Sequence, residues 1–365
     1  VWWARRDELV SRGALVRRIG PAVAKEDIPQ GTGDTHALTV SRVVDEARGT
    51  KSFELAVPEA LRPVFRHAAG QFTTVEVVID DHLIKSFAFA ADDYTPWYFD
   101  SGVSGWGRLG HSAMLAKELV AIFLTAYDAN SVVGLHQKEE VWYHAPVRFG
   151  TRVTLSGRYV DKYTKRGKGY VVLDGEARDE LGNLLVRQRS TEIMRVPEKV
   201  ALGAGSAPPP DRRVTGTWPG DKSPESSVRP DVPVGTPIAP LTKRVYQDQM
   251  AVFSGIGKHW HNIHTDIEAA RRGGFSQTLA QGMMETCWLS EMLGNYFGPS
   301  WLSNGWMAMA FLNPVFANDL ITGKGVVIDA RDEPDGRQLE LEIWCENEQG
   351  QMTAAGWAKG VAARA

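Results

Sequence analysis

The sequence has little cysteine and no excess of charge of either sign. Cys287 and Cys345 are its only cysteines, too few for a disulfide framework and without the CxxC spacing of a metal site. The 41 basic and 44 acidic residues give a formal net charge of −3, and no basic patch interrupts this balance. These absences exclude a disulfide-rich secreted scaffold and leave no electrostatic argument for binding nucleic acid.

Long apolar runs are also absent. The longest, residues 112–127, contains Lys117 and Glu118 and is shorter than the ~20 apolar residues that span a bilayer. The first residues lack the apolar core of a signal peptide, and because the chain does not begin with methionine we expect its N-terminus to be incomplete. Together with the few cysteines, this pattern predicts a cytoplasmic protein that does not enter a membrane.

Proline, glycine, serine and charged residues are concentrated in residues 204–240, which we expect to form a linker without a packed core. The segments on its two sides show the same order of signals. The Pro-Val pairs at Pro146 and Pro314 are separated by 314 − 146 = 168 positions, and the turn glycines Gly182 and Gly350 by 350 − 182 = 168. The shared offset predicts a duplicated fold; coincidence is the alternative, because such turns are common.

Each half combines a helix pattern with strand patterns. Polar residues are sparse in residues 111–127 and 278–297, as expected for long helices that are buried on most sides. Short segments rich in β-branched and aromatic residues follow each helix and predict antiparallel strands. This order indicates an α+β fold in which a sheet curls around a central helix. We divide the chain into an N-terminal appendage, a first half, the linker and a second half, at residues 1–74, 75–203, 204–240 and 241–365.

Histidine is concentrated in one segment of the second half. His259, His261 and His264 are three of the nine histidines and fall within six positions, next to Asp266. Zinc binding is one interpretation, but no cysteine and no HExxH frame accompanies the cluster. A polar loop whose imidazoles bond only to the backbone is a second interpretation. We favour acid–base catalysis on a small molecule, without a metal, because histidine exchanges protons near neutral pH.

The residues around this cluster carry a family resemblance. A Ser-Gly pair, the run Asn-Ile-His-Thr-Asp, a Gly-Phe pair and then Ala-Gln-Gly-Met occupy residues 253–284 in that order. This pattern resembles the MaoC-like dehydratase and (R)-specific enoyl-CoA hydratase family. The segments at residues 87–98 and 163–170 also resemble parts of such proteins, so the resemblance covers residues 75–365. It implies a tandem, or double, hot dog in which each half is an antiparallel sheet wrapped around a long central helix.

The resemblance also implies a function in fatty-acid or lipid metabolism. A family member binds a CoA thioester between its halves and adds water to, or removes it from, an α,β double bond, with no cofactor. His264 matches the catalytic histidine, and Gly282 matches the position whose backbone N–H points at the thioester carbonyl. A helix start suits the developing oxyanion because its amides are unpaired and carry partial positive charge. We expect five further residues to contact the substrate, namely His261, Asn262, Gln281, Met283 and Arg271.

One position departs from the family pattern. In the hydratases a Gly-Asp-x-Asn-Pro run precedes the histidine, and its aspartate falls here on His259. Either His259 replaces it, or Asp266 or another acid supplies the carboxylate, or the protein binds thioesters without hydrating them. A hot dog acyl-CoA thioesterase is a further alternative. The sequence specifies neither the acyl group nor the stereochemistry, and it leaves a homodimer open.

The first half has no equivalent of the catalytic histidine. Subtracting 168 from 264 gives Pro96, and residues 83–110 contain no histidine. We therefore expect the first half to shape the cavity, and His111 and His136 to be structural. Before it, residues 42–77 resemble the opening strands of a ferredoxin-reductase-like flavin domain. The flavin motif is replaced by Lys85-Ser-Phe-Ala and no Gly-rich nucleotide half follows, so we expect no flavin function.

Overall fold

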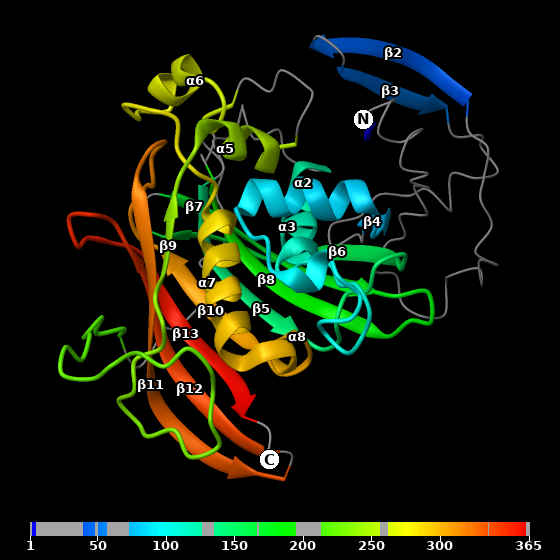
Figure 1. Cartoon of the computed structure of the whole chain (residues 1–365). Helices are drawn as coiled ribbons and strands as arrows, with labels where there is room; N and C mark the ends of the chain where they lie inside the picture. Colours follow the sequence, from blue (N-terminus) through cyan, green and yellow to red (C-terminus); the bar gives the residue numbers. More distant parts are fainter. Residues whose placement is uncertain are drawn as a thin grey trace.

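The computed structural model describes nine segments of the chain, residues 2–4, 39–47, 50–56, 73–125, 135–165, 168–194, 213–255, 262–334 and 336–362. Within them, strands β1 (Trp2–Ala4), β2 (Thr39–Ala47) and β3 (Thr50–Ala56) form a small sheet in the order β1-β3-β2. The flavin-like resemblance thus coincides in part with an antiparallel hairpin of β2 and β3 (Figure 1). None of the helices in the described segments combines the length and apolar character needed to cross a membrane.

The first half is built from helices followed by an antiparallel meander. Its elements are β4 (Thr73–Val78), α2 (Asp81–Ala91), the 3-10 helix η2 (Pro96–Tyr98), α3 (Met114–Val120), the 3-10 helix η3 (Ala121–Thr125), β5 (Leu135–Tyr143), β6 (Arg152–Lys165), β7 (Lys168–Arg178) and β8 (Leu184–Met194).

The second half repeats this order. Its elements are β9 (Leu241–Arg244), α5 (Gln247–Phe253), α6 (Ile267–Arg272), α7 (Gly282–Phe297), the 3-10 helix η4 (Gly298–Ser300), α8 (Trp301–Asn304), β10 (Trp306–Phe311), β11 (Leu320–Glu333), β12 (Gly336–Glu346) and β13 (Met352–Ala362).

Both halves contribute to one continuous ten-stranded sheet, in the order β4-β6-β7-β8-β5-β10-β13-β12-β11-β9. The halves meet where β5 pairs antiparallel with β10, with Trp142 opposite Trp306 and Lys138 opposite Ala310. Along β13, fully buried and partly buried residues alternate, so one face of this strand packs on the core. Figure 1 shows α7 lying across the strands of the second half and α3 lying over those of the first.

The predicted duplication is confirmed by the strand boundaries. Adding 168 to the bounds of β6, 152 and 165, gives 320 and 333, the bounds of β11, and the same offset converts β7 into β12 and β8 into β13. The turn glycines Gly182 and Gly350 occupy the same place and have φ of 83° and 71°. Glycine adopts this left-handed backbone most readily because it has no Cβ, which explains why both turns carried the signal that revealed the repeat.

The helix of the first half is shorter than expected. The sequence predicted a long helix over residues 111–127, whereas α3 ends at Val120 and continues as the 3-10 helix η3. Val120, Ile122 and Thr125 are β-branched and lose side-chain freedom in an α-helix, so they weaken its C-terminal part. In the second half α7 runs for 16 residues and is buried on nearly all sides, as predicted.

The described part of the expected linker, residues 213–240, packs on the second half. Val232 and Ile238 are fully buried in the core. The backbone N–H groups of Gly235 and Ile238 donate to Val327 and Gly325 of β11 at 2.7 and 2.9 Å. The expectation that this segment contributes no core was therefore wrong, because a few apolar residues between prolines suffice once the backbone bonds to a strand. The domain boundaries themselves stay a prediction.

Candidate functional site

A cavity of about 590 Å³ lies between the two halves. The first half contributes residues of α3, β5 and β8 to its wall, and the second half contributes the segments around residues 262–264, 279–283 and 311–315. The cavity wall includes the side chains or backbone polar groups of Lys117, His136, Glu192, Asn262, His264, Arg272, Gln281, Gly282 and Glu285. The cavity therefore brings five of the predicted site residues of the second half, Asn262, His264, Gln281, Gly282 and Met283, together with side chains of the first half.

His264 is held at the cavity by a compact turn. The buried Asn262 accepts the backbone N–H of His264 at 2.9 Å and the Thr265 hydroxyl at 3.2 Å through its Oδ1. The Gln247 amide donates to the backbone carbonyl of His264 at 2.9 Å. The imidazole itself is fixed by a 2.7 Å bond between Nδ1 and the carbonyl of Leu279. Both the backbone and the ring of His264 are thus positioned by hydrogen bonds.

The bond to Leu279 determines which nitrogen of His264 carries a proton. A carbonyl oxygen only accepts, so Nδ1 must be the donor, and Nε2 of the neutral ring keeps a free lone pair. Burial lowers the pKa of His264 to about 4, although the Leu279 carbonyl opposes this shift. At neutral pH the ring is therefore a neutral imidazole whose Nε2 can accept a proton.

Gly282 is the first residue of α7 and lines the same cavity. The preceding Gln281 does not cap the helix through its side chain, which instead donates to the Ser254 hydroxyl at 2.8 Å. A Cβ on Gly282 would lie 3.0 Å from the ring of Phe311, tighter than ordinary contact. The glycine thus lets the helix start approach the cavity wall closely, and the first amides of a helix have no partner within the helix.

The other predicted site residues divide into three groups. Asn262, Gln281 and Met283 line the cavity with His264 and Gly282, and their contact with a substrate stays a prediction. Asp266 and Arg271 are not among its lining residues. Within the described part of the chain, no group of three or more His, Cys, Asp or Glu side chains is arranged to hold a metal ion. His259 and His261 lie outside the described residues.

Asp266 and Arg271 have local partners that explain their places. Asp266 is the N-cap of α6, and its Oδ1 accepts the backbone N–H groups of Glu268 and Ala269 at 2.8 and 3.1 Å. Arg271 is exposed and pairs with Glu268 at 2.7 Å, whereas its neighbour Arg272 lines the cavity. We correct the expectation for these two residues: the structure gives Asp266 a capping role and Arg271 a surface ion pair.

Comparisons with known proteins agree with this geometry. The profile of the MaoC-like domain matches residues 226–347. The chain carries a MaoC-like domain. The profile of a FAS1-like dehydratase domain region matches residues 67–187, so the first half is a FAS1-like dehydratase region. A UPF0336 protein of Streptomyces griseus is 28% identical over 127 residues, which cover 32% of this chain and 83% of that protein.

Solved structures with the same fold cover both the FAS1-like region and the MaoC-like domain. A MaoC-like dehydratase superposes with a TM-score of 0.64 at 14% identity, covering 81% of this chain and 98% of the other. A MaoC domain protein from Chloroflexus aurantiacus gives 0.60 at 12% identity, with coverage of 82% and 96%. A double hot dog protein from Mycobacterium tuberculosis gives 0.58 at 14% identity, with coverage of 81% and 96%. The α+β double hot dog fold is confirmed.

Sequence reasoning missed a carboxyl group of the MaoC-like domain. Glu285, in the first turn of α7, lines the cavity and is 3% exposed. The Thr353 hydroxyl donates to its Oε1 at 2.5 Å. Burial raises the pKa of Glu285 to about 8, against the effect of the Thr353 bond. The sequence signal for this group is one acidic residue in the first turn of a buried helix. Such residues are common there because they interact favourably with the helix dipole, so the signal does not by itself indicate a functional carboxyl group.

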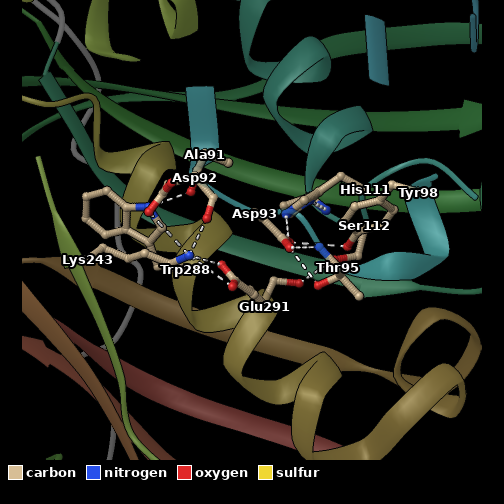
Figure 2. A network of polar contacts seen from close by, with 12 residues as sticks. Ala91, Asp92, Asp93, Thr95, Tyr98, His111, Ser112, Lys243, Trp288 and Glu291 are labelled. Carbon is tan, nitrogen blue, oxygen red and sulfur yellow. Dashed lines mark hydrogen bonds and ion pairs between the residues drawn. The ribbon is translucent and has the colours of Figure 1, made fainter. Parts of the chain in front are cut away.

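The FAS1-like region holds a different structure where the MaoC-like domain holds its site. Since 279 − 168 = 111, His111 is the counterpart of Leu279, the residue whose carbonyl anchors His264. Nε2 of His111 contacts Oδ2 of Asp93 at 2.6 Å, and both side chains are almost completely buried (Figure 2). Thr95 donates to Oδ1 of Asp93 from its hydroxyl at 2.6 Å and from its backbone at 3.0 Å.

This buried pair is enclosed by contacts between the halves. Trp288 of α7 donates to the carbonyl of Ala91 at 3.1 Å, and Lys243 of β9 bonds to the carbonyl of Asp92 and to Glu291 (Figure 2). Burial alone would raise the pKa of Asp93, but His111 and the Thr95 donors lower it to about 2. Neither Asp93 nor His111 lines the cavity, so the expected structural role of His111 fits its geometry.

Proposed function

We propose that this protein is a lyase that adds water to a 2-enoyl-CoA thioester, or removes water in the reverse direction. The observation that carries the proposal is the shared cavity of His264 and Gly282. It offers an imidazole with an unprotonated Nε2 and a helix start whose amides have no partner within the helix. The match of the MaoC-like profile to these residues supports the same reaction class.

In the proposed mechanism His264 and the start of α7 have separate tasks. Nε2 of His264 takes a proton from a water molecule while the water oxygen bonds to the β-carbon. The electron pair of the double bond moves toward the thioester, whose oxygen becomes enolate-like. The backbone N–H of Gly282 donates to this oxygen, where the partial positive charge of the helix start stabilises it. Proton transfer to the α-carbon completes the addition.

We infer that Glu285 supplies the carboxyl group that position 259 lacks. Its raised pKa keeps it protonated at neutral pH, whereas the lowered pKa of His264 keeps the imidazole unprotonated. Two groups whose pKa values are pushed apart in this way are suited to act as the acid and the base of one reaction. Glu285 would deliver its proton to the α-carbon and become a carboxylate. The proton that His264 took from water would then pass to Glu285, which restores both groups for the next turnover.

Arg272 is the candidate for the phosphates of CoA. It lines the cavity and is exposed, as a residue at the cavity mouth must be to meet a charged group in solvent. Its guanidinium can form paired hydrogen bonds with phosphate oxygens. This assignment replaces the one that the sequence suggested for Arg271.

Turnover of enoyl-CoA esters tests the proposal. The purified protein is mixed with crotonyl-CoA and with longer and branched 2-enoyl-CoA esters, and the absorbance of the conjugated thioester is followed. We expect this absorbance to fall while no free thiol is released. Release of thiol, detected with a thiol reagent, would indicate a thioesterase instead. Binding of CoA esters without either signal would make the protein an acyl-CoA-binding protein, as the missing carboxylate at position 259 allows.

A further inference from the structure

A cluster of ionisable side chains lies in the part of the cavity wall that the first half forms. His136 and Glu139 belong to β5, and Glu192 belongs to β8, directly opposite His136 in the strand register. Nε2 of His136 lies 3.0 Å from Oε2 of Glu139 and 3.8 Å from Oε1 of Glu192. Figure 1 shows β5 and β8 side by side, next to α7. The cluster thus combines one imidazole with two carboxyl groups.

Two of the three side chains in the cluster line the cavity, and the third does not. His136 and Glu192 line the cavity, whereas Glu139 does not and accepts a hydrogen bond from Gln188 at 2.8 Å. Glu192 is only 5% exposed. Among the residues that the structure describes, Oε1 of Glu192 has no hydrogen-bond partner. A buried carboxyl oxygen at a cavity wall without a donor is costly for the folded protein unless something in the cavity supplies one.

The fold itself does not require these charges. Adding 168 to the positions of His136, Glu139 and Glu192 gives Asn304, Met307 and Gly360 in the second half. Asn304 lies in α8, whereas Met307 and Gly360 lie in β10 and β13, so the second half has no ionisable cluster at the equivalent positions. A buried charged group is also weak evidence for stability. A specific function in the cavity accounts better for the three side chains of the first half.

The position of the cluster indicates which part of a substrate it would meet. The rings of His136 and Phe311 pack with their centroids 4.9 Å apart, and Phe311 is the side chain against which Gly282 lies. One aromatic ring thus separates the cluster from the start of α7. The cluster is therefore close to the proposed thioester position, on the side of the first half, while Arg272 belongs to the second half. With Arg272 proposed for the phosphates of CoA, we take the acyl chain to extend from the thioester toward this cluster.

We propose that His136 and Glu192 bind a hydroxyl group on the acyl chain, beyond the β-carbon, so that the preferred substrates are hydroxylated acyl thioesters. The inference rests on the proposed function, because it takes the acyl chain to lie in this cavity. A hydroxyl can donate to the carboxyl group of Glu192, whose Oε1 has no hydrogen-bond partner among the described residues and lies 3.8 Å from Nε2 of His136. A cationic group would face the imidazole, and an anionic group would face two carboxyl groups, so a neutral donor fits the cluster best.

The protonation of the cluster supports a neutral ligand. Burial alone would lower the pKa of His136, but the carboxyl groups of Glu192 and Glu139 raise it to about 9, so the ring is cationic at neutral pH. Burial raises the pKa of Glu192, although His136 opposes this shift. The cluster thus carries its own compensating charges, and a ligand need not bring any.

Calorimetric binding of unreactive esters tests this inference separately from catalysis. The probes are pairs of saturated acyl-CoA esters of equal length, with and without a hydroxyl group, which is placed at successive carbons beyond the β-carbon. In the wild type we expect at least one hydroxylated ester to bind about tenfold more tightly than its partner. Glu192→Leu should remove this preference and leave the affinity for the unsubstituted ester unchanged. Glu348→Leu, at an exposed turn, is the matched control.

Each result has one meaning. Equal affinities for every pair in the wild type would overturn the hydroxyl site while leaving the proposed function intact. The same holds if Glu192→Leu keeps the preference. If no CoA ester binds at all, the proposed function fails together with this inference. Should Glu192→Leu not fold, Glu192→Gln preserves the shape, and because it replaces a charged acceptor by a neutral one it must weaken the preference.

Discussion

The two halves differ at equivalent positions of their shared fold: these positions open onto a cavity in the second half and are buried in the first. In the MaoC-like domain, the carbonyl of Leu279 anchors the ring of His264, and Gly282 brings the start of α7 to a cavity. At the counterpart of Leu279, the FAS1-like region has His111, sealed against Asp93. At the counterpart of Gly282 it has Met114, which is fully buried (282 − 168 = 114).

This difference shows what the site needs beyond the hot dog fold. Both halves place a helix start beside a loop. In the first half, however, a methionine side chain occupies the position of the glycine, and a histidine paired with a buried carboxyl group takes the position of the anchoring residue. The enclosed pair can contribute to stability but cannot meet a substrate. The proposed chemistry of the second half thus depends on a small residue at the helix start and on a histidine that reaches the cavity.

The largest effect on kcat should come from placing a side chain at the start of α7, where the second half has glycine and the first half has methionine. Gly282→Val places a Cβ against the ring of Phe311 and displaces the amide. We expect kcat to fall by about 10²-fold to 10³-fold, the usual effect of losing one oxyanion donor. Met114→Ala is the control in the inactive half: it should cost about 3 kcal/mol of unfolding free energy and leave kcat unchanged. Equal kcat losses in both variants would contradict the assignment.

Removing the buried carboxylate of the first half should affect stability and not catalysis. Asp93→Asn leaves the ring of His111 without its anionic partner, and we expect a loss of about 3 kcal/mol in unfolding free energy. The folded pKa of Asp93, about 2, is below the ordinary value, so its contribution is present above about pH 4 and is lost as the pH falls toward 2. Denaturant unfolding at neutral and at acid pH measures both effects. A large drop in kcat/KM with unchanged stability would refute the structural role.

The two halves also differ at position 285, because the counterpart of Glu285 in the first half is Lys117 (285 − 168 = 117). Glu285→Gln keeps the shape of the side chain but removes the transferable proton, and we expect kcat to fall by about 100-fold. Thr353→Val removes only the hydroxyl that donates to Glu285 and should change kcat much less. Steady-state kinetics on an enoyl-CoA ester compares the two. Full activity of Glu285→Gln would remove this residue from the mechanism.

The pH dependence of kcat/KM should show both groups. The reaction in the hydration direction needs neutral His264, so the rate should rise as the pH increases through about 4. It needs protonated Glu285, so the rate should fall as the pH increases through about 8. Glu285→Gln should abolish the fall at high pH and keep the rise at low pH. A profile without the low-pH limb in the wild type would show that His264 is not the base.

Much of this organisation was predictable from the sequence. The turn glycines and Pro-Val pairs revealed the repeat because tight turns demand particular residues, and the motif placed His264, Asn262 and Gly282 together. Asp266 misled because an aspartate before a short helix serves as an N-cap as well as it serves catalysis. Glu285 and Glu192 were missed because burial and pairing between elements distant in the sequence depend on tertiary packing, which no local pattern expresses.

The most direct test of the account is the activity of His264→Ala on the best enoyl-CoA substrate. We predict that kcat/KM falls at least about 10³-fold while circular dichroism and the unfolding midpoint stay close to those of the wild type. His144→Ala, which changes an exposed histidine away from the cavity, should keep full activity. A folded His264→Ala protein that retained activity within about tenfold of the wild type would contradict the central claim that this imidazole is the base.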